Sequence, residues 1–311
     1  GVWTLVITPL VMFYVRAIGL MIAARLWIIP RFDFRGMRGT VAFGGALTVC
    51  QILWVIQSQA DIAIAGRRFD PYHLGLYFEA LFLAQILTSK FIPPLNEVAF
   101  PSYVELHNRG TEIATAFIST VRLTMFVAAP IYLGMAATAG PLIETLFGPK
   151  WLEMIPFVQL LALAMPFFAL QVIFSPATNA MGKPGIYVKS SLAGALIMPA
   201  AFLIGIQQSP IGLGYAWLAG APLLLLFTML LSLPTIGARA RDIMRAVAPS
   251  AVAAAIMAAT VVFAEMQFLS ALSAPARLVL LVPLGAAIYI GLSWRFQRNT
   301  IDDLVGFVRK R

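Results

Sequence analysis

Three positively charged side chains lie deep within long apolar stretches of the sequence: Arg16, Lys90 and Arg122. A charge at membrane depth is costly and usually functional. Arginine offers a bidentate fork and lysine a point charge, and both suit the oxygens of a pyrophosphate. The three residues therefore predict a cavity that binds an anionic group. The alternative is that each cation pairs with a neighbouring acid or snorkels to the membrane interface.

Two acids and three amides also fall inside apolar stretches. Asp61 and Glu97 suggest ion coupling or gating, whereas the alternative is interface anchoring or an ion pair such as Asp61 with Arg67. The amides would add hydrogen-bonding groups to a polar cavity, and they are Gln51, Gln57 and Gln85. Gln57 and Asp61 are four residues apart, so they share one face of a helix.

Motifs for enzymatic chemistry are absent from the sequence. It contains no GxSxG, no HExxH, no glycine-rich phosphate loop followed by lysine, and no CxxC. Two histidines and one cysteine cannot build an ordinary metal site. We therefore predict no catalytic residues, no metal and no cofactor, and expect that the protein is not an enzyme.

The composition explains why these polar residues stand out. Apolar side chains make up 60% of the 311 residues and charged ones 11%, and the mean hydropathy is +0.88. Too few charges remain to cover a soluble globule, and the composition excludes a disordered chain and a disulfide-stapled secreted fold. The net charge of +9 has a simpler source than nucleic-acid binding, because cytoplasmic loops of membrane proteins collect lysine and arginine.

The elements that must position these residues are membrane-spanning helices. A bilayer core needs roughly 20 apolar residues per helix, and helices satisfy their own backbone groups in lipid. The predicted fold class is therefore all-α, a polytopic helical membrane protein with about nine transmembrane helices. Nine stretches qualify, near 2–29, 40–65, 75–100, 114–139, 153–178, 186–207, 211–233, 246–264 and 276–294.

Loop charges set the expected orientation. Alternate loops carry most of the cations, which places those loops and the C-terminus in the cytoplasm by the positive-inside rule. The segment 295–311 has apolar residues on one helical face with basic residues around them, so we expect a cytoplasmic amphipathic tail on the inner membrane surface, with a frayed tail as the alternative. Nine spans then put Gly1 outside, which suggests further helices upstream.

Four motifs resemble those of one transporter family. They are Gly1-Val2-Trp3-Thr4-Leu5-Val6; Asp61 to Arg67 followed by Leu74-Gly75-Leu76-Tyr77 and Ala80; Phe100-Pro101-Ser102-Tyr103; and Leu146 to Trp151. Their order resembles the polysaccharide transporter family, the O-antigen and exopolysaccharide flippases of the multidrug/oligosaccharidyl-lipid/polysaccharide exporter superfamily. The likeness covers about the first half of the chain.

The resemblance implies a division into parts of a fourteen-helix protein. Residues 1–29 would be the last helix of the first lobe, whose five upstream helices are missing, and 30–39 a cytoplasmic inter-lobe loop. Residues 40–233 would form the complete six-helix second lobe. Residues 234–294 would be two additional C-terminal helices, followed by the tail 295–311.

The resemblance also implies a function. Family members move undecaprenyl-pyrophosphate-linked oligosaccharide across the bacterial inner membrane by alternating access, for O-antigen or exopolysaccharide synthesis. The implied partners are this lipid-linked substrate, membrane lipids, a polysaccharide polymerase and a chain-length regulator. We expect no nucleic acid among the partners. The alternatives are a peptidoglycan-precursor flippase or small-molecule exporter of the same superfamily, or a polytopic cell-wall assembly enzyme.

Overall fold

A computed structural model describes residues 3–25, 38–207 and 209–297. The chain divides into two units, residues 1–45 and 46–311, with the boundary inside the second helix. Within the described residues every regular element is helical, and nine helical segments are long and apolar enough to cross a membrane. The predicted all-α polytopic class is thereby confirmed.

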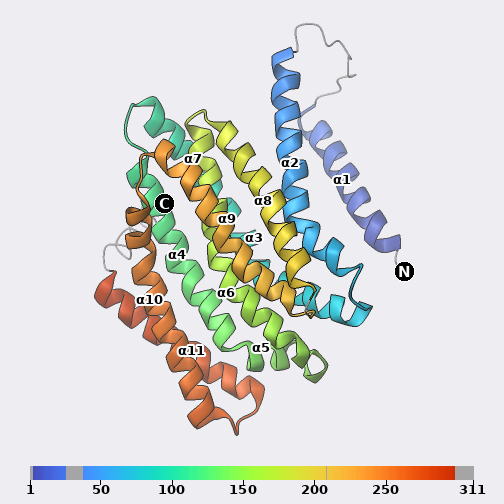
Figure 1. Cartoon of the computed structure of the whole chain (residues 1–311), viewed down its shortest axis with the longest axis vertical. Coiled ribbons are helices and arrows are strands. Elements are labelled where there is room, and N and C mark those ends of the chain that lie inside the picture. The colour runs from blue at the N-terminus through green and yellow to red at the C-terminus, as the bar shows by residue number, and fades with distance from the viewer. Residues whose placement is uncertain (1–2, 26–37, 208, 298–311) are drawn as a thin grey trace. The chain divides into compact units, whose positions relative to one another are not determined.

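The helices follow the predicted spans closely (Figure 1). They are α1 (Trp3–Ala23), α2 (Arg38–Ala65), α3 (Pro71–Asn108), α4 (Ala114–Ala137), α5 (Ala139–Leu146), the 3₁₀ helix η1 (Pro149–Met154), α6 (Ile155–Val172), α7 (Phe174–Ala180), α8 (Pro184–Gly205), α9 (Gly212–Ile236), α10 (Ala240–Ala264), the π-helical turn η2 (Glu265–Leu269) and α11 (Ala274–Phe296).

The first unit contains α1 and the beginning of α2. Arg16 is the one charged residue of α1, whose sequence is otherwise apolar or uncharged from Trp3 to Ala23. Most of the predicted inter-lobe loop 30–39 and nearly all of the predicted tail 295–311 lie outside the described residues. The division into lobes stays a prediction.

In the second unit, α6 lies at the centre of the helix packing. It contacts α3, α4 and α9, and α8 packs along α9. The last two helices join the same body, since α10 packs along α4 and α11 contacts α5 and α10 (Figure 1). In this body α10 and α11 thus pack against α4 and α5, and the division that treats them as two additional C-terminal helices stays a prediction.

The third span is longer than the predicted 75–100, because local signals extend α3 in both directions. Asp70 caps its start by accepting a hydrogen bond from the His73 backbone N–H, and Pro71 occupies the first turn, where its missing N–H costs nothing. The helix ends at Asn108, and two residues later Gly110 adopts φ +68°, a conformation that glycine tolerates without strain and that turns the chain away.

The fifth span is broken between α6 and α7 rather than continuous. Pro176 has no backbone N–H, so the carbonyl of Val172, four residues earlier, loses its usual helical partner. The Ser175 hydroxyl donates to this carbonyl at 3.4 Å. Because of the break, Gln171 lies at the end of α6 and Ser175 at the start of α7. Both residues line a cavity.

Candidate functional site

Asp61 is a fully buried acid on α2, with 0% of its surface exposed. Its Oδ2 accepts a hydrogen bond from the Tyr77 hydroxyl at 2.6 Å, and the Trp217 indole N–H lies 3.3 Å from the same oxygen. Its Oδ1 accepts from the Ile62 backbone N–H at 2.8 Å. The indole N–H of Trp217 also donates to the Tyr77 hydroxyl at 2.9 Å. We call Asp61, Tyr77 and Trp217 the acid network.

The acid network joins three helices far apart in sequence. Asp61 comes from α2, Tyr77 from α3 and Trp217 from α9. The ring of Trp217 packs against Phe168 and Phe202, each with its centroid 5.6 Å away, so the indole N–H is held in one direction. Asp61 therefore has neutral donors around it and no ion pair within the described part of the chain, and Arg67 is exposed.

A polar cavity of about 180 Å³ lies one turn along α2 from Asp61. We call it the glutamine cavity, and it is lined by Gln51, Trp54, Gln57, Gln171, Val172, Ser175, Tyr187 and Ser191. These residues come from α2, α6, α7 and α8. No lining residue carries a charge. Two of the three predicted cavity amides, Gln51 and Gln57, thus lie together, while Gln85 on α3 is not among the lining residues.

Gln57 reaches its place because α8 has a glycine opposite it. A Cβ atom added to Gly194 would lie 1.8 Å from Gln57 Oε1 and 2.5 Å from its Cδ. Such distances are impossible, so only a residue without a side chain leaves room for the amide. Gln57 is 1% exposed and Gln171 is 9% exposed.

Aromatic contacts link the cavity wall to the acid network. The Trp54 ring, which lines the cavity, stacks on Phe168 with centroids 6.1 Å apart and an interplanar angle of 22°. Phe168 in turn meets Trp217 edge-on. The two sites also share α2, through Gln57 and Asp61.

The three predicted cations make no ion pair among the residues that the structure describes. The ion pairs there are His73–Asp70, Arg109–Glu105, and Arg277 with both Glu144 and Glu265. Lys90 is exposed and Arg122 is half-buried. Arg16 belongs to the first unit, whereas Lys90 and Arg122 belong to the second. Glu97 is exposed on α3 and does not join the acid network.

Lys90 and Arg122 lie at two different levels of one helix pair. Two hydroxyl contacts fix the alignment of α3 with α4: Tyr103 with Thr120 at 2.7 Å, and Thr88 with Tyr132. Lys90 is two residues from Thr88, and Arg122 is two residues from Thr120. With a helical rise of 1.5 Å per residue, the two levels are roughly 12–16 Å apart along the helices.

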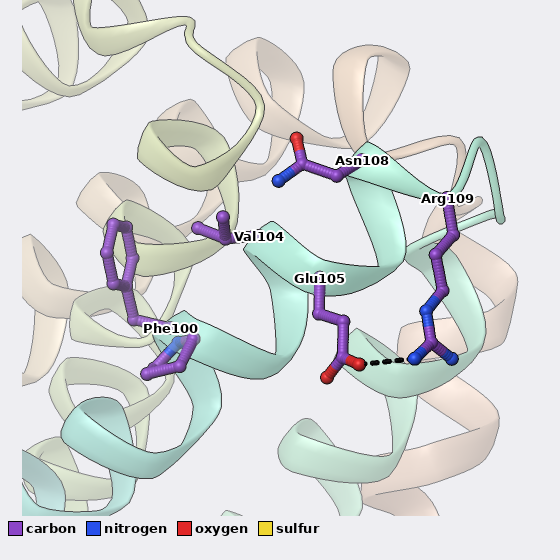
Figure 2. Close-up of a pocket in the computed structure, with 6 residues that line it drawn as sticks. Phe100, Val104, Glu105, Asn108 and Arg109 are labelled. Atoms are coloured by element: carbon purple, nitrogen blue, oxygen red, sulfur yellow. Dashed lines mark hydrogen bonds and ion pairs between the residues drawn. The ribbon is translucent and has the colours of Figure 1, made fainter.

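A surface hollow at the end of α3 is lined by Phe100, Pro101, Val104, Glu105, Asn108 and Arg109 (Figure 2). Figure 2 shows the Arg109 guanidinium turned back to Glu105, and the two are 2.5 Å apart. Both side chains are exposed. The cation is thus occupied by its neighbour, so this hollow offers no free charge to an anion.

Several residues of both sites are missed by reasoning from sequence. The partners of Asp61 are uncharged aromatic residues, one of them 156 positions away, and aromatic residues in an apolar span carry no polar signal. Gln171 is visible as an amide in a span, but Ser175, Tyr187 and Ser191 are not distinctive. In the described ranges no group of three or more His, Cys, Asp or Glu residues could hold a metal ion.

Comparisons with known proteins point to one family. A family profile described as "Polysaccharide biosynthesis protein" matches residues 1–156, half of the chain. The teichuronic acid biosynthesis protein TuaB of Bacillus subtilis is 25% identical over 191 residues, which is 60% of this chain and 38% of TuaB. The succinoglycan biosynthesis transport protein ExoT of Rhizobium meliloti is 24% identical over 220 residues, 70% of this chain and 44% of ExoT. The chain spans less than half the length of these relatives.

A solved structure has the same fold. The lipid II flippase MurJ, in an inward closed conformation, matches with a TM-score of 0.70 over 91% of this chain and 59% of that protein. Sequence identity is 15%, so the likeness speaks for the fold alone. The fold is that of a polytopic helical membrane protein.

Proposed function

Because the chain belongs to the polysaccharide biosynthesis protein family, we propose that the full-length protein is a flippase for lipid-linked oligosaccharide. Its substrate would be undecaprenyl-pyrophosphate-linked oligosaccharide, moved from the cytoplasmic to the periplasmic leaflet of the bacterial inner membrane. The product would serve O-antigen or exopolysaccharide synthesis. A polysaccharide polymerase and a chain-length regulator would be partners, and the C-terminus would be cytoplasmic.

The observation that carries the proposal is the family match together with unpaired cations inside the spans. A pyrophosphate and its sugars cannot cross about 30 Å of hydrocarbon unaided. Lys90 and Arg122 make no ion pair within the described residues, so their charges are available to an anion. Because they lie at two levels of α3 and α4, we propose that they contact the pyrophosphate at successive stages of transport. Arg16 would provide a third contact from α1.

The acid network would serve as a gate or coupling element. Asp61 ties α2, α3 and α9 together through one carboxylate. All three helices belong to the predicted second lobe, so the network would act as a gate within that lobe: breaking these hydrogen bonds would let α2 shift against α3 and α9. Glu97, exposed on α3, is a second candidate for this role.

A peptidoglycan-precursor flippase is the second candidate function. The lipid II flippase MurJ has this fold, so the fold is compatible with such a function and does not by itself select between the two. Its substrate would carry the same pyrophosphate, so the same cations would act in the same way. The two functions differ in the sugars attached, and a strain lacking the protein would separate them: the first predicts loss of surface polysaccharide, the second a defect of the cell wall.

The test is to replace Arg16, Lys90 and Arg122 singly by methionine in the full-length protein and to measure surface polysaccharide. The matched control is Arg241→Met, since Arg241 is an exposed cation near the start of α10. We expect polymer to fall in at least one span variant and to be unchanged in the control. Unchanged polymer in all three span variants, each present at the wild-type level, would reject the cation site.

A further inference from the structure

The lining of the glutamine cavity is polar but uncharged, so its binding properties differ from those of the cations and the acids in the spans. Three amides, two serines, a tyrosine and a tryptophan line it, and none of them is charged. Amides and hydroxyls both donate and accept hydrogen bonds, and the tryptophan adds a flat apolar face. Since Trp54 is stacked on Phe168, the orientation of that face is fixed. The cavity is therefore suited to a neutral ligand with many hydroxyl groups.

Two buried amide atoms of the cavity residues lack hydrogen-bond partners. They are Nε2 of Gln57, a donor, and Oε1 of Gln171, an acceptor. A buried polar group without a partner costs about 1–3 kcal/mol, so such groups call for explanation. Hydroxyl groups can accept from such a donor and donate to such an acceptor, whereas an anion could serve only the donor and a cation only the acceptor.

The size of the cavity limits the ligand. A volume of 180 Å³ corresponds to about six water molecules at roughly 30 Å³ each, which is the scale of one sugar ring rather than of a whole oligosaccharide. Gln57, Gln171 and Ser191 are buried at its inner side, and Gln51 is exposed. A ring that enters past Gln51 would reach the Gln57 and Gln171 side chains, whose unpaired amide atoms become its partners once the amides turn toward it.

We propose that the glutamine cavity binds one uncharged sugar ring of the transported substrate, separately from the cations that meet its pyrophosphate. This inference rests on the proposed function and adds a subsite to it. A site that hydrogen-bonds a hydroxyl discriminates strongly against a ring that lacks it or points it elsewhere, because its own buried groups then stay unpaired. The cavity would thus help to select which sugar is carried.

The experiment measures protection of a thiol inside the cavity. Ser175→Cys places a thiol on the lining, in full-length protein from which Cys50 and any other cysteine have been removed. The rate of its alkylation is measured with and without methyl glycosides of neutral hexoses and N-acetylhexosamines, and with inorganic pyrophosphate. We expect at least one glycoside to slow the reaction threefold or more, and pyrophosphate to leave it unchanged.

Gln57→Met and Gln171→Met then test the named contacts, because methionine has a similar length and no hydrogen-bonding amide. Either variant should abolish the protection. The matched control is Gln159→Met, the same change on α6 at an exposed position outside the cavity. If a buried variant does not fold, Gln51→Met at the exposed side of the same cavity replaces it, and it should weaken the protection.

The sugar subsite is overturned if no glycoside protects the thiol, which would mean that the cavity holds only water, or if the glutamine variants are protected as well as the wild type. The proposed function fails by a different result. It fails if the wild-type protein, reconstituted in liposomes, does not translocate a fluorescently labelled lipid-linked oligosaccharide, whatever the glycosides do at the cavity.

Discussion

The Tyr77 hydroxyl donates its hydrogen bond to Asp61 Oδ2 at 2.6 Å, with both residues fully buried. This contact joins α2 to α3, and Trp217 of α9 donates to both partners. A buried acid held by neutral donors is sensitive to the loss of any one of them, because the carboxylate cannot turn to water instead.

Tyr77→Phe should therefore destabilise the protein by about 2 kcal/mol, since it takes a donor away from a buried carboxyl oxygen. The measurement is the free energy of unfolding of the detergent-solubilised full-length protein in a denaturant titration. Tyr215→Phe is the matched control, because Tyr215 is exposed on α9 and should change stability by less than about 0.5 kcal/mol. Equal effects of the two changes would show that the Asp61 contact contributes nothing.

Gly194→Ala should disturb the glutamine cavity. The added Cβ would lie 1.8 Å from Gln57 Oε1, so the flexible end of the Gln57 side chain must turn away from its buried place beside α8, at a cost of about 1 kcal/mol. Gly185→Ala is the control on the same helix, since nothing lies within 4 Å of a Cβ there. Unfolding in denaturant compares the two variants. Indistinguishable midpoints would contradict the close approach of Gln57 to α8.

Arg277→Met should loosen α11. Arg277 bonds Glu144 of α5 at 3.0 Å and Glu265 of the π-helical turn at 3.2 Å, and its own side chain is 20% exposed. The variant leaves two acids without their shared cation. We expect faster protease cleavage between α10 and α11 than in the wild type. Arg241→Met, an exposed cation without an ion pair among the described residues, should be cleaved at the wild-type rate.

Asp70 should make the free energy of unfolding decrease as the pH is lowered. Hydrogen bonds from the backbone N–H and the side chain of His73 lower the pKa of the Asp70 carboxyl below its ordinary value of 3.8. A lowered pKa in the folded state means that the stabilisation is complete above the ordinary value and is lost as the pH falls through the folded value. Asp70→Asn keeps a capping oxygen but cannot titrate.

The stability difference between wild type and Asp70→Asn should accordingly shrink as the pH is lowered from about 6 to about 3. Thermal unfolding midpoints of both proteins over this range give the measurement, because all other acids titrate equally in the two. A difference that grows on acidification would contradict the capping role of the carboxylate.

Much of the fold is legible in the sequence, because hydrophobic length is a direct physical requirement of the bilayer. The nine predicted spans correspond to the nine membrane-length helical segments found among the residues that the structure describes. Boundaries depend on weaker local signals, so the Asp70 cap and the Gly110 turn lengthen α3 beyond 75–100. The break at Pro176 could have been predicted from proline alone, yet other prolines, such as Pro130 in α4, lie inside unbroken helices.

The candidate site can be predicted only in part from the sequence. Gln51, Gln57 and Asp61 are visible as polar residues in an apolar span, and spacing places Gln57 and Asp61 on one face. Their partners come from helices whose packing the sequence does not reveal: Tyr77, Trp217 and Gly194. Aromatic and small residues are also common in apolar spans without any such role. Depth in the spans picks out Arg16, Lys90 and Arg122 as candidates, but it does not predict what they contact.

The proposed flippase function is tested most directly by measuring translocation by the purified full-length protein in liposomes. A fluorescent undecaprenyl-pyrophosphate-linked oligosaccharide is placed in one leaflet, and its arrival in the other is followed by a membrane-impermeant quencher. We predict translocation by the wild type and by Arg241→Met, and a rate at least about tenfold lower for at least one of Arg16→Met, Lys90→Met and Arg122→Met, as expected for loss of a charge-assisted hydrogen bond. Wild-type rates in all three variants would contradict the cation site, and a wild-type protein that moves no lipid-linked sugar would contradict the proposed function.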